Sequence, residues 1–210
     1  MKGIFITFEG PEGSGKSTQS KLLYRYLKEK GFNVVYLREP GGTKISEKIR
    51  KILLDSKNES ITSTCEMLLY MAARSQVVSE VIRPALTKGK IVICDRFLDS
   101  TLVYQGFGLG VDIKIISNIG NIVTAGIKPD LTILLDLPAQ KGLKVCGRIK
   151  DRIEKRSLCY HLSVRKGYLK LASGEPKRIK VIKVDKDKHK TQEKIRKLVS
   201  HFLRLCRLGI

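Results

Sequence analysis

Cysteine is scarce in this sequence and follows no recognisable spacing. The five cysteines are odd in number and scattered, and no pair has C-x-x-C spacing. This pattern argues against a disulfide framework and against a zinc site. No stretch approaches the ~18 apolar residues of a membrane span, and the N-terminus does not read as a signal peptide. We therefore expect a cytoplasmic protein without a membrane anchor.

Acidic residues are also few, with 20 against 41 lysines and arginines, which gives a net charge of +21. The imbalance is concentrated in residues 141–210, where 22 basic residues face 6 acidic ones. Such a surface can attract polyanions nonspecifically. Too few aromatic residues interleave with the lysines to form a platform for stacked bases. A solvated lysine-rich face is the favoured interpretation, and nucleic acid is not a required partner.

Residues 10–17 read Gly-Pro-Glu-Gly-Ser-Gly-Lys-Ser and match the phosphate-binding pattern G-x-x-x-x-G-K-[ST] at every fixed position. An apolar run at residues 4–8 predicts a strand before the loop, and leucines at helical spacing predict a helix after it. This order points backbone N–H groups and a helix N-terminus at an anion. We expect Lys16 to reach the β- and γ-phosphates of ATP and Ser17 to hold Mg²⁺. The other expected ATP-binding residues of this region are Gly10, Pro11, Glu12, Gly13, Ser14, Gly15 and Thr18.

Apolar runs alternate with helical patterns along the whole chain. Strands are expected at residues 4–8, 33–37, 91–94, 131–135 and 179–184. Helical patterns separate them, the longest over residues 63–86 and the last over residues 191–208. This alternation predicts an α/β protein with a five-stranded parallel sheet between two layers of helices. No linker or repeat is visible, so residues 1–210 are expected to form a single domain.

Charged residues follow the ends of the expected strands. Arg38 ends the second strand, Asp95 and Arg96 end the third, and Asp136 ends the fourth. Ligands of parallel α/β sheets bind beyond these carboxyl ends. A hydrolase could use such groups, but fixed arginines also offset the repulsion between two phosphorylated substrates. The arginines favour a kinase with a phosphorylated acceptor, and Asp136 is expected to be structural, for example as a helix cap.

Several motifs occur in a characteristic order. They are Arg38-Glu39-Pro40-Gly41-Gly42-Thr43, the block from Leu68 to Arg74, Asp95-Arg96-Phe97 followed by Ser100 and Tyr104-Gln105-Gly106, and Asp151-Arg152-Ile153-Glu154. Together with the phosphate loop they resemble the thymidylate (dTMP) kinase family over residues 4 to about 172. The resemblance implies a P-loop kinase fold and Mg²⁺-dependent phosphoryl transfer from ATP to dTMP, giving dTDP for dTTP synthesis. It also implies a homodimer.

The resemblance implies a role for each residue of the acceptor site. Arg38 and Arg96 would hold the acceptor monophosphate, and Arg96 would also act on the transferred group. Tyr70 would stack on thymine, and Arg74, one helical turn later, would bond the base edge. An ordinary core position is the alternative for Tyr70, and a polar partner is expected for an arginine in so apolar a helix. The remaining implied substrate contacts are Ser100, Thr101, Tyr104 and Gln105, of which Tyr104 would crowd C2′ of the sugar.

The resemblance also implies a short basic lid over about residues 144–156. Residue 13 is glycine rather than arginine, which places the chain in the subgroup that takes its transition-state cation from the lid. Arg148 is the expected cation, and Arg152 is expected to bind ATP. The catalytic set is thus Lys16, Arg96, Arg148 and Glu12. The expected metal-associated oxygens belong to Ser17, Asp95 and Glu12.

Two other functions are compatible with parts of the sequence. The phosphate loop could open another nucleoside monophosphate kinase, such as a guanylate kinase, but Tyr70, Arg74 and Gln105 favour thymine. A basic P-loop ATPase acting on nucleic acid would explain the charge. It would not explain the arginines at the strand ends.

Overall fold

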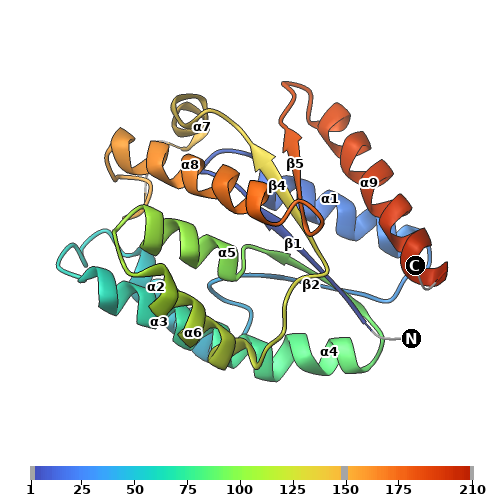
Figure 1. Ribbon diagram of the computed structural model, residues 1–210, viewed down its shortest axis with the longest axis horizontal. Helices are drawn as coiled ribbons and strands as arrows, with labels where there is room; N and C mark the ends of the chain where they lie inside the picture. The colour runs from blue at the N-terminus through green and yellow to red at the C-terminus, as the bar shows by residue number, and fades with distance from the viewer. Residues whose placement is uncertain (1–2, 148–150, 209–210) are drawn as a thin grey trace.

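The computed structural model describes residues 3–147 and 151–208 and contains a five-stranded parallel sheet between two layers of helices (Figure 1). The strands are β1 (Ile4–Glu9), β2 (Val34–Arg38), β3 (Ile91–Asp95), β4 (Leu131–Asp136) and β5 (Ile179–Lys183). Their order across the sheet is β2-β3-β1-β4-β5. The strand that leads into the glycine loop is therefore central. The expected fold class is confirmed, and Arg148 of the expected lid lies outside the described residues.

Helices cover both faces of the sheet. In chain order the helical elements are α1 (Lys16–Glu29), α2 (Lys44–Leu54), α3 (Ser63–Val77), η1 (Val78–Ile82), α4 (Arg83–Thr87), α5 (Leu98–Thr101), η2 (Leu102–Phe107), α6 (Ile113–Thr124), α7 (Ala139–Val145), α8 (Leu158–Gly174) and α9 (Lys188–Leu208). Within the described part of the chain, no helix is both long enough and apolar enough to cross a membrane.

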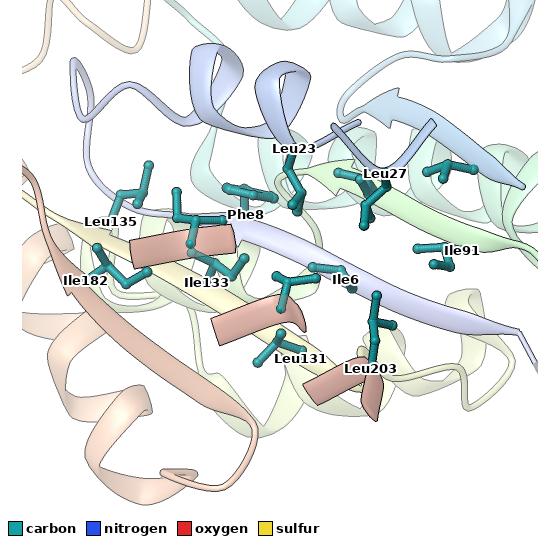
Figure 2. Close-up of a cluster of buried hydrophobic side chains, with 14 residues drawn as sticks. Ile6, Phe8, Leu23, Leu27, Ile91, Leu131, Ile133, Leu135, Ile182 and Leu203 are labelled. Carbon is teal, nitrogen blue, oxygen red and sulfur yellow. The ribbon is translucent and has the colours of Figure 1, made fainter. Parts of the chain in front are cut away.

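The core follows the alternation of side chains along each strand. On β1, Ile6 and Phe8 lie in one buried cluster with Leu23 and Leu27 of α1, together with apolar residues of α9 (Figure 2). Phe5, which comes directly before Ile6, lies in a different cluster on the opposite face, with residues of α3, η1 and α4. Because both faces are buried, the sheet is held rigidly, and its carboxyl edge is a fixed platform for the site.

Two segments of π-helix depart from the regular helical spacing that the sequence suggests. The pattern over residues 63–86 is one continuous stretch, but η1 separates α3 from α4. The second segment, η2, carries Tyr104 and Gln105, both buried. The wider π turn often occurs at functional sites and shifts the direction of the side chains that follow. A search for a 3.6-residue period cannot detect this shift.

Candidate active site

The phosphate loop joins β1 to α1 at the carboxyl edge of the sheet. Gly13 (φ 68°) and Gly15 (φ 83°) have left-handed backbone conformations that side chains disfavour. No side chain caps the N-terminus of α1, so its first N–H groups stay available to an anion. The loop therefore has the geometry of a phosphate cradle.

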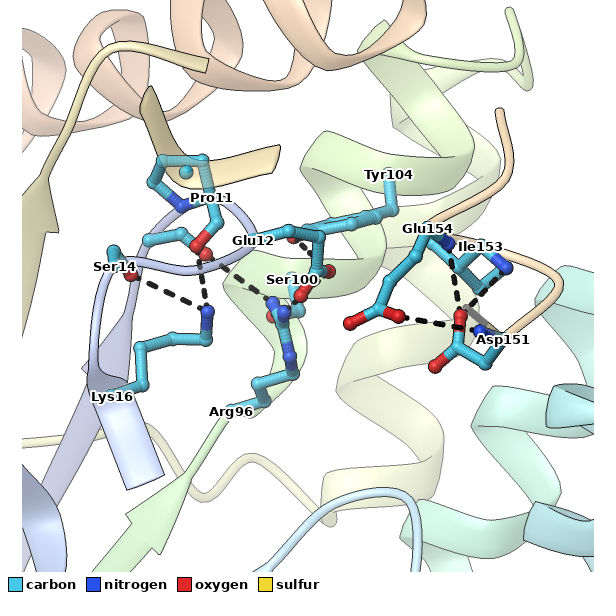
Figure 3. Close-up of polar contacts among 12 residues, drawn as sticks. Pro11, Glu12, Ser14, Lys16, Arg96, Ser100, Tyr104, Asp151, Ile153 and Glu154 are labelled. Atoms are coloured by element: carbon cyan, nitrogen blue, oxygen red, sulfur yellow. Dashed lines mark hydrogen bonds and ion pairs between the residues drawn. The ribbon is translucent and has the colours of Figure 1, made fainter. Parts of the chain in front are cut away.

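Lys16 lies inside this cradle and is only 6% exposed. Its Nζ donates to the Pro11 carbonyl oxygen at 2.8 Å and to Ser14 Oγ at 3.4 Å (Figure 3). Burial lowers the pKa of Lys16 to about 8; the charge of Arg96 adds to this effect, and the Glu12 carboxylate opposes it. The ammonium is thus short of negative charge, which nucleotide phosphates would supply.

Ser17 and Asp95 form the pair expected to hold a metal. The Ser17 hydroxyl donates to Asp95 Oδ2. The other carboxylate oxygen, Oδ1, is buried and has no partner among the described residues. A hydroxyl beside an unsatisfied carboxylate oxygen fits Mg²⁺, which usually takes one or two protein oxygens together with substrate phosphates. Across residues 3–147 and 151–208 no group of three His, Cys, Asp or Glu side chains could hold a metal, so the pair would need the nucleotide to complete the site.

Arg96 follows β3 in a left-handed conformation, with φ 71°, which is uncommon for a residue other than glycine. Its guanidinium lies 4.8 Å from the ring centre of Tyr104 and pairs with Glu12 at 2.7 Å. The Tyr104 hydroxyl donates to the same Glu12 oxygen at 2.8 Å (Figure 3). The arginine is therefore held on two sides, above the phosphate loop.

Glu12 is a strongly acidic carboxyl. Burial alone would raise its pKa, but Arg96, Lys16 and Tyr104 outweigh burial and lower the pKa to about 2. Glu12 is thus ionised at neutral pH. In the structure Glu12 lies between Arg96 and Tyr104, and its expected association with a metal stays a prediction.

A second carboxyl, Glu9, lies behind Arg96 and was not identified from the sequence. It is 1% exposed and accepts hydrogen bonds from the Phe97 N–H at 2.8 Å, Ser100 Oγ at 2.6 Å and the Tyr168 hydroxyl at 2.8 Å. Burial, and then the charge of Asp99, raise the pKa of Glu9 to about 7 against these hydrogen bonds. Glu9 therefore fixes the backbone directly after Arg96.

A cavity of about 360 Å³ extends from the phosphate loop towards α3 and η2. The expected residues that line it are Glu12, Gly13, Gly15, Lys16, Ser17, Thr18, Arg38, Tyr70, Asp95, Arg96, Ser100, Thr101, Tyr104 and Gln105. One end carries the phosphate-binding groups, and the other carries the aromatic and amide side chains of Tyr70 and Gln105. Segments far apart in the sequence are thus brought into one site.

Two arginines, Arg38 and Arg50, line this cavity. Arg38 Nη1 and Arg50 Nη1 each donate to the Pro40 carbonyl oxygen at 2.9 Å. Arg38 also pairs with Glu47 at 3.1 Å. Burial and the charge of Arg38 lower the pKa of Arg50, and the Glu47 carboxylate only partly offsets this effect. Arg50 was not predicted from the sequence. The one indication there is its position on the helix that follows the Arg38 motif.

Arg74 does not line the cavity. It is 1% exposed, and its Nε pairs with Glu39 at 2.8 Å. Its Nη1 donates to Thr101 Oγ1 at 2.9 Å and its Nη2 to the Phe97 carbonyl oxygen at 3.0 Å. The expected polar partner is therefore present. Contact between Arg74 and a base stays a prediction.

Arg152 does not approach the phosphate loop. This side chain is 7% exposed, donates to the Leu53 carbonyl oxygen at 2.9 Å and pairs with Glu66 at 2.6 Å. Asp136, expected to be structural, pairs with Arg165 at 2.7 Å. It does not cap α7, whose N-cap residue is Pro138.

A glycine loop on a central strand, a buried lysine, a hydroxyl–carboxylate pair and a cluster of cavity arginines together define a P-loop phosphotransferase. The family profile described as thymidylate kinase matches residues 8–195. The chain belongs to the thymidylate kinase family, and the resemblance stated from the motifs is confirmed.

Individual relatives agree over nearly the whole chain. The thymidylate kinase of Symbiobacterium thermophilum is 48% identical over 201 residues, which cover 95% of this chain and 94% of that protein. The thymidylate kinase of Geobacter sulfurreducens is 52% identical over 188 residues, covering 86% of this chain and 88% of that protein. The crystal structure of thymidylate kinase from Ehrlichia chaffeensis matches with a TM-score of 0.79 at 34% identity, covering 95% of this chain and all of that one.

Proposed function

We propose that the protein transfers the γ-phosphoryl group of ATP to dTMP, giving dTDP and ADP. The observation that carries this proposal is the single cavity that joins the phosphate loop to Arg38, Arg50, Tyr70 and Gln105. A hydrolase needs only the first part of this site. A second set of cations and base-sized contacts suits a phosphorylated nucleotide as acceptor.

The donor end holds the triphosphate by positioning and charge. Backbone N–H groups at the start of α1 and the ammonium of Lys16 bind the donor phosphates. Ser17 and Asp95 would hold Mg²⁺, which neutralises charge on the β- and γ-phosphates when it is bound. The low exposure of Lys16 keeps water away and strengthens its attraction to phosphate.

The acceptor end holds the monophosphate against the donor. Arg38, Arg50 and Arg96 offset the repulsion between the two anionic substrates. An oxygen of the acceptor phosphate attacks the γ-phosphorus, the bond from phosphorus to the β–γ bridging oxygen breaks, and ADP leaves with that oxygen. Arg96, stacked on Tyr104 and paired with Glu12, is placed to stabilise charge on the transferred group.

The geometry of Gly13 supports a lid cation. A Cβ atom at Gly13 would lie 2.1 Å from the Gly142 carbonyl oxygen of α7, so the loop has no room for a side chain at this position. A transition-state cation must then come from elsewhere. We propose Arg148, which lies outside the described residues.

The test is an ADP-release assay with ATP·Mg²⁺ and five candidate acceptors: dTMP, dUMP, dGMP, GMP and poly(dT). Turnover that depends on dTMP supports the proposal. Preference for GMP would indicate another nucleoside monophosphate kinase. Stimulation by poly(dT) without any effect of dTMP would indicate an ATPase that acts on nucleic acid.

Replacement of Arg96 tests the acceptor assignment. We expect Arg96→Ala to lower turnover by at least about a hundredfold, because it removes charge stabilisation of the transferred group. Arg83→Ala, at an exposed position on α4, is the control and should keep full activity. If Arg96→Ala stayed within tenfold of the parent, the role of Arg96 would be wrong.

We also propose that the protein is a homodimer formed through α2, α3 and α6. These neighbouring helices carry large exposed apolar side chains: Ile45 (50%), Leu68 (47%), Ile115 (50%) and Ile122 (75%). We expect Ile122→Lys to shift the mass in light scattering towards the monomer. Val181→Lys on β5, where Val181 is 45% exposed, should not. A parent protein of monomeric mass would contradict this proposal.

A cytoplasmic location is the corresponding proposal for the compartment. All five cysteines are free thiols, as a reducing environment favours.

A further inference from the structure

Glu66, in the first turn of α3, is a fully buried carboxylate with three donors and was not identified from the sequence. It is 0% exposed. Its Oε1 accepts from Gln105 Nε2 at 2.8 Å. Its Oε2 accepts from both Arg152 and Arg156, each at 2.6 Å. The two oxygens thus have different partners: Oε2 pairs with two guanidinium groups, and Oε1 accepts a hydrogen bond from an amide.

This division fixes the orientation of the Gln105 amide. A carboxylate paired with arginines only accepts hydrogen bonds, so the amide must turn its NH₂ group towards Glu66. Gln105 also lines the cavity, and no described residue donates to its Oε1. The side-chain oxygen of Gln105 therefore faces the cavity as a hydrogen-bond acceptor.

We propose that Glu66 is a specificity-determining positioning residue, which selects thymine over cytosine by holding the Gln105 amide with its oxygen towards the base. The inference rests on the proposed function, in which Gln105 touches the base. The N3 position of thymine is an N–H donor, whereas N3 of cytosine is an acceptor. A fixed oxygen attracts the first and repels the second.

Because Arg152 and Arg156 both pair with Glu66, the effect of replacing this residue with glutamine can be predicted. In Glu66→Gln, the atom at Oε2 still faces Arg152 and Arg156, so the new amide must place its oxygen there. Its NH₂ group then faces Gln105. The Gln105 amide turns over, bonds the new NH₂ group through its oxygen, and offers its own NH₂ group to the cavity.

The experiment measures kcat/KM for dTMP and for dCMP in the full-length enzyme with ATP·Mg²⁺. We expect Glu66→Gln to lower the dTMP-to-dCMP ratio by at least about tenfold, since one matched hydrogen bond becomes a donor facing a donor. The dTMP value should fall and the dCMP value rise. If Glu66 were only structural, its loss would reduce the amount of active enzyme. Both kcat/KM values would then fall by the same factor, and their ratio would not change.

A matched control is available on η1. Glu80 is exposed and accepts from the amide of Gln76, so Glu80→Gln makes the same chemical change outside the cavity. Its ratio should equal that of the parent. A Glu66→Gln enzyme whose ratio stays within twofold of the parent would overturn the inference.

A second variant keeps the test decisive if Glu66→Gln does not fold. Gln105→Leu removes the acceptor and should lower the dTMP-to-dCMP ratio, and an unchanged ratio would overturn the inference. Where both variants fold, Glu66→Gln should have no further effect on the ratio in the Gln105→Leu background. A parent enzyme active on neither nucleotide would instead refute the proposed function, and the inference with it.

Discussion

Glu9→Gln would remove the buried carboxyl behind Arg96 while keeping its shape. The pKa of Glu9 is raised to about 7 from an ordinary value of 4.5, first by burial and then by Asp99. The folded protein therefore binds a proton that the unfolded chain releases. The stability that this proton confers is fully present below pH 4.5 and is lost as the pH rises through 7.

The expected magnitude follows from linkage. A pKa that rises from 4.5 to about 7 makes Glu9 contribute roughly 2–3 kcal/mol less to folding at pH 8 than at pH 5. Glutamine does not titrate, and its amide offers a donor and an acceptor, as a neutral carboxyl does. The free energy of unfolding of Glu9→Gln minus that of the parent should therefore be roughly 2–3 kcal/mol larger at pH 8 than at pH 5.

Urea unfolding of both proteins at the two pH values measures this difference. Groups that do not interact with Glu9 titrate alike in both proteins, so their contributions cancel in the comparison. A pH-dependent difference below about 0.5 kcal/mol, near the limit of such measurements, would refute a raised pKa at Glu9.

Three further predictions concern other parts of the site. Arg74→Met should lower the free energy of unfolding by about 3–5 kcal/mol in urea, because it leaves Glu39 buried and unpaired; a loss below about 1 kcal/mol would contradict the ion pair. The Kd of ATP should rise about tenfold between pH 7 and pH 9 in titration calorimetry, since Lys16 loses its proton near pH 8 in the free enzyme; a flat profile would contradict this pKa. Gly13→Ala should lower the free energy of unfolding by about 1–3 kcal/mol and reduce turnover, because φ 68° is strained for alanine, whereas Gly174→Ala, where a Cβ meets nothing, should be silent.

The fold was predictable because the local hydrophobic patterns and the position of the glycine loop indicate the same order of strands and helices. Apolar runs mark all five strands to within two residues, and a helix follows the phosphate loop as its spacing requires. Most of the cavity was predictable for a similar reason. Its residues follow the carboxyl ends of strands or lie on the helical elements that come after them, and topology brings those positions together.

The supporting carboxyls were not predictable. Glu9, Glu39 and Glu66 occur in the sequence as ordinary acidic residues, and their importance comes from burial against partners distant in the chain. Glu66 lies 39 residues from Gln105 and 90 from Arg156. No local pattern encodes such pairings. The ion pair between Arg152 and Glu66 was missed for the same reason, and ATP binding by Arg152 stays a prediction.

The close contact between Gly13 and Gly142 has a consequence for α7. A Cβ on Gly142 would lie 2.1 Å from the Glu12 carbonyl oxygen, just as one on Gly13 would collide with α7. At these two positions the phosphate loop and α7 therefore contact each other through main chain. A side chain at either glycine would therefore separate α7 from the phosphate loop.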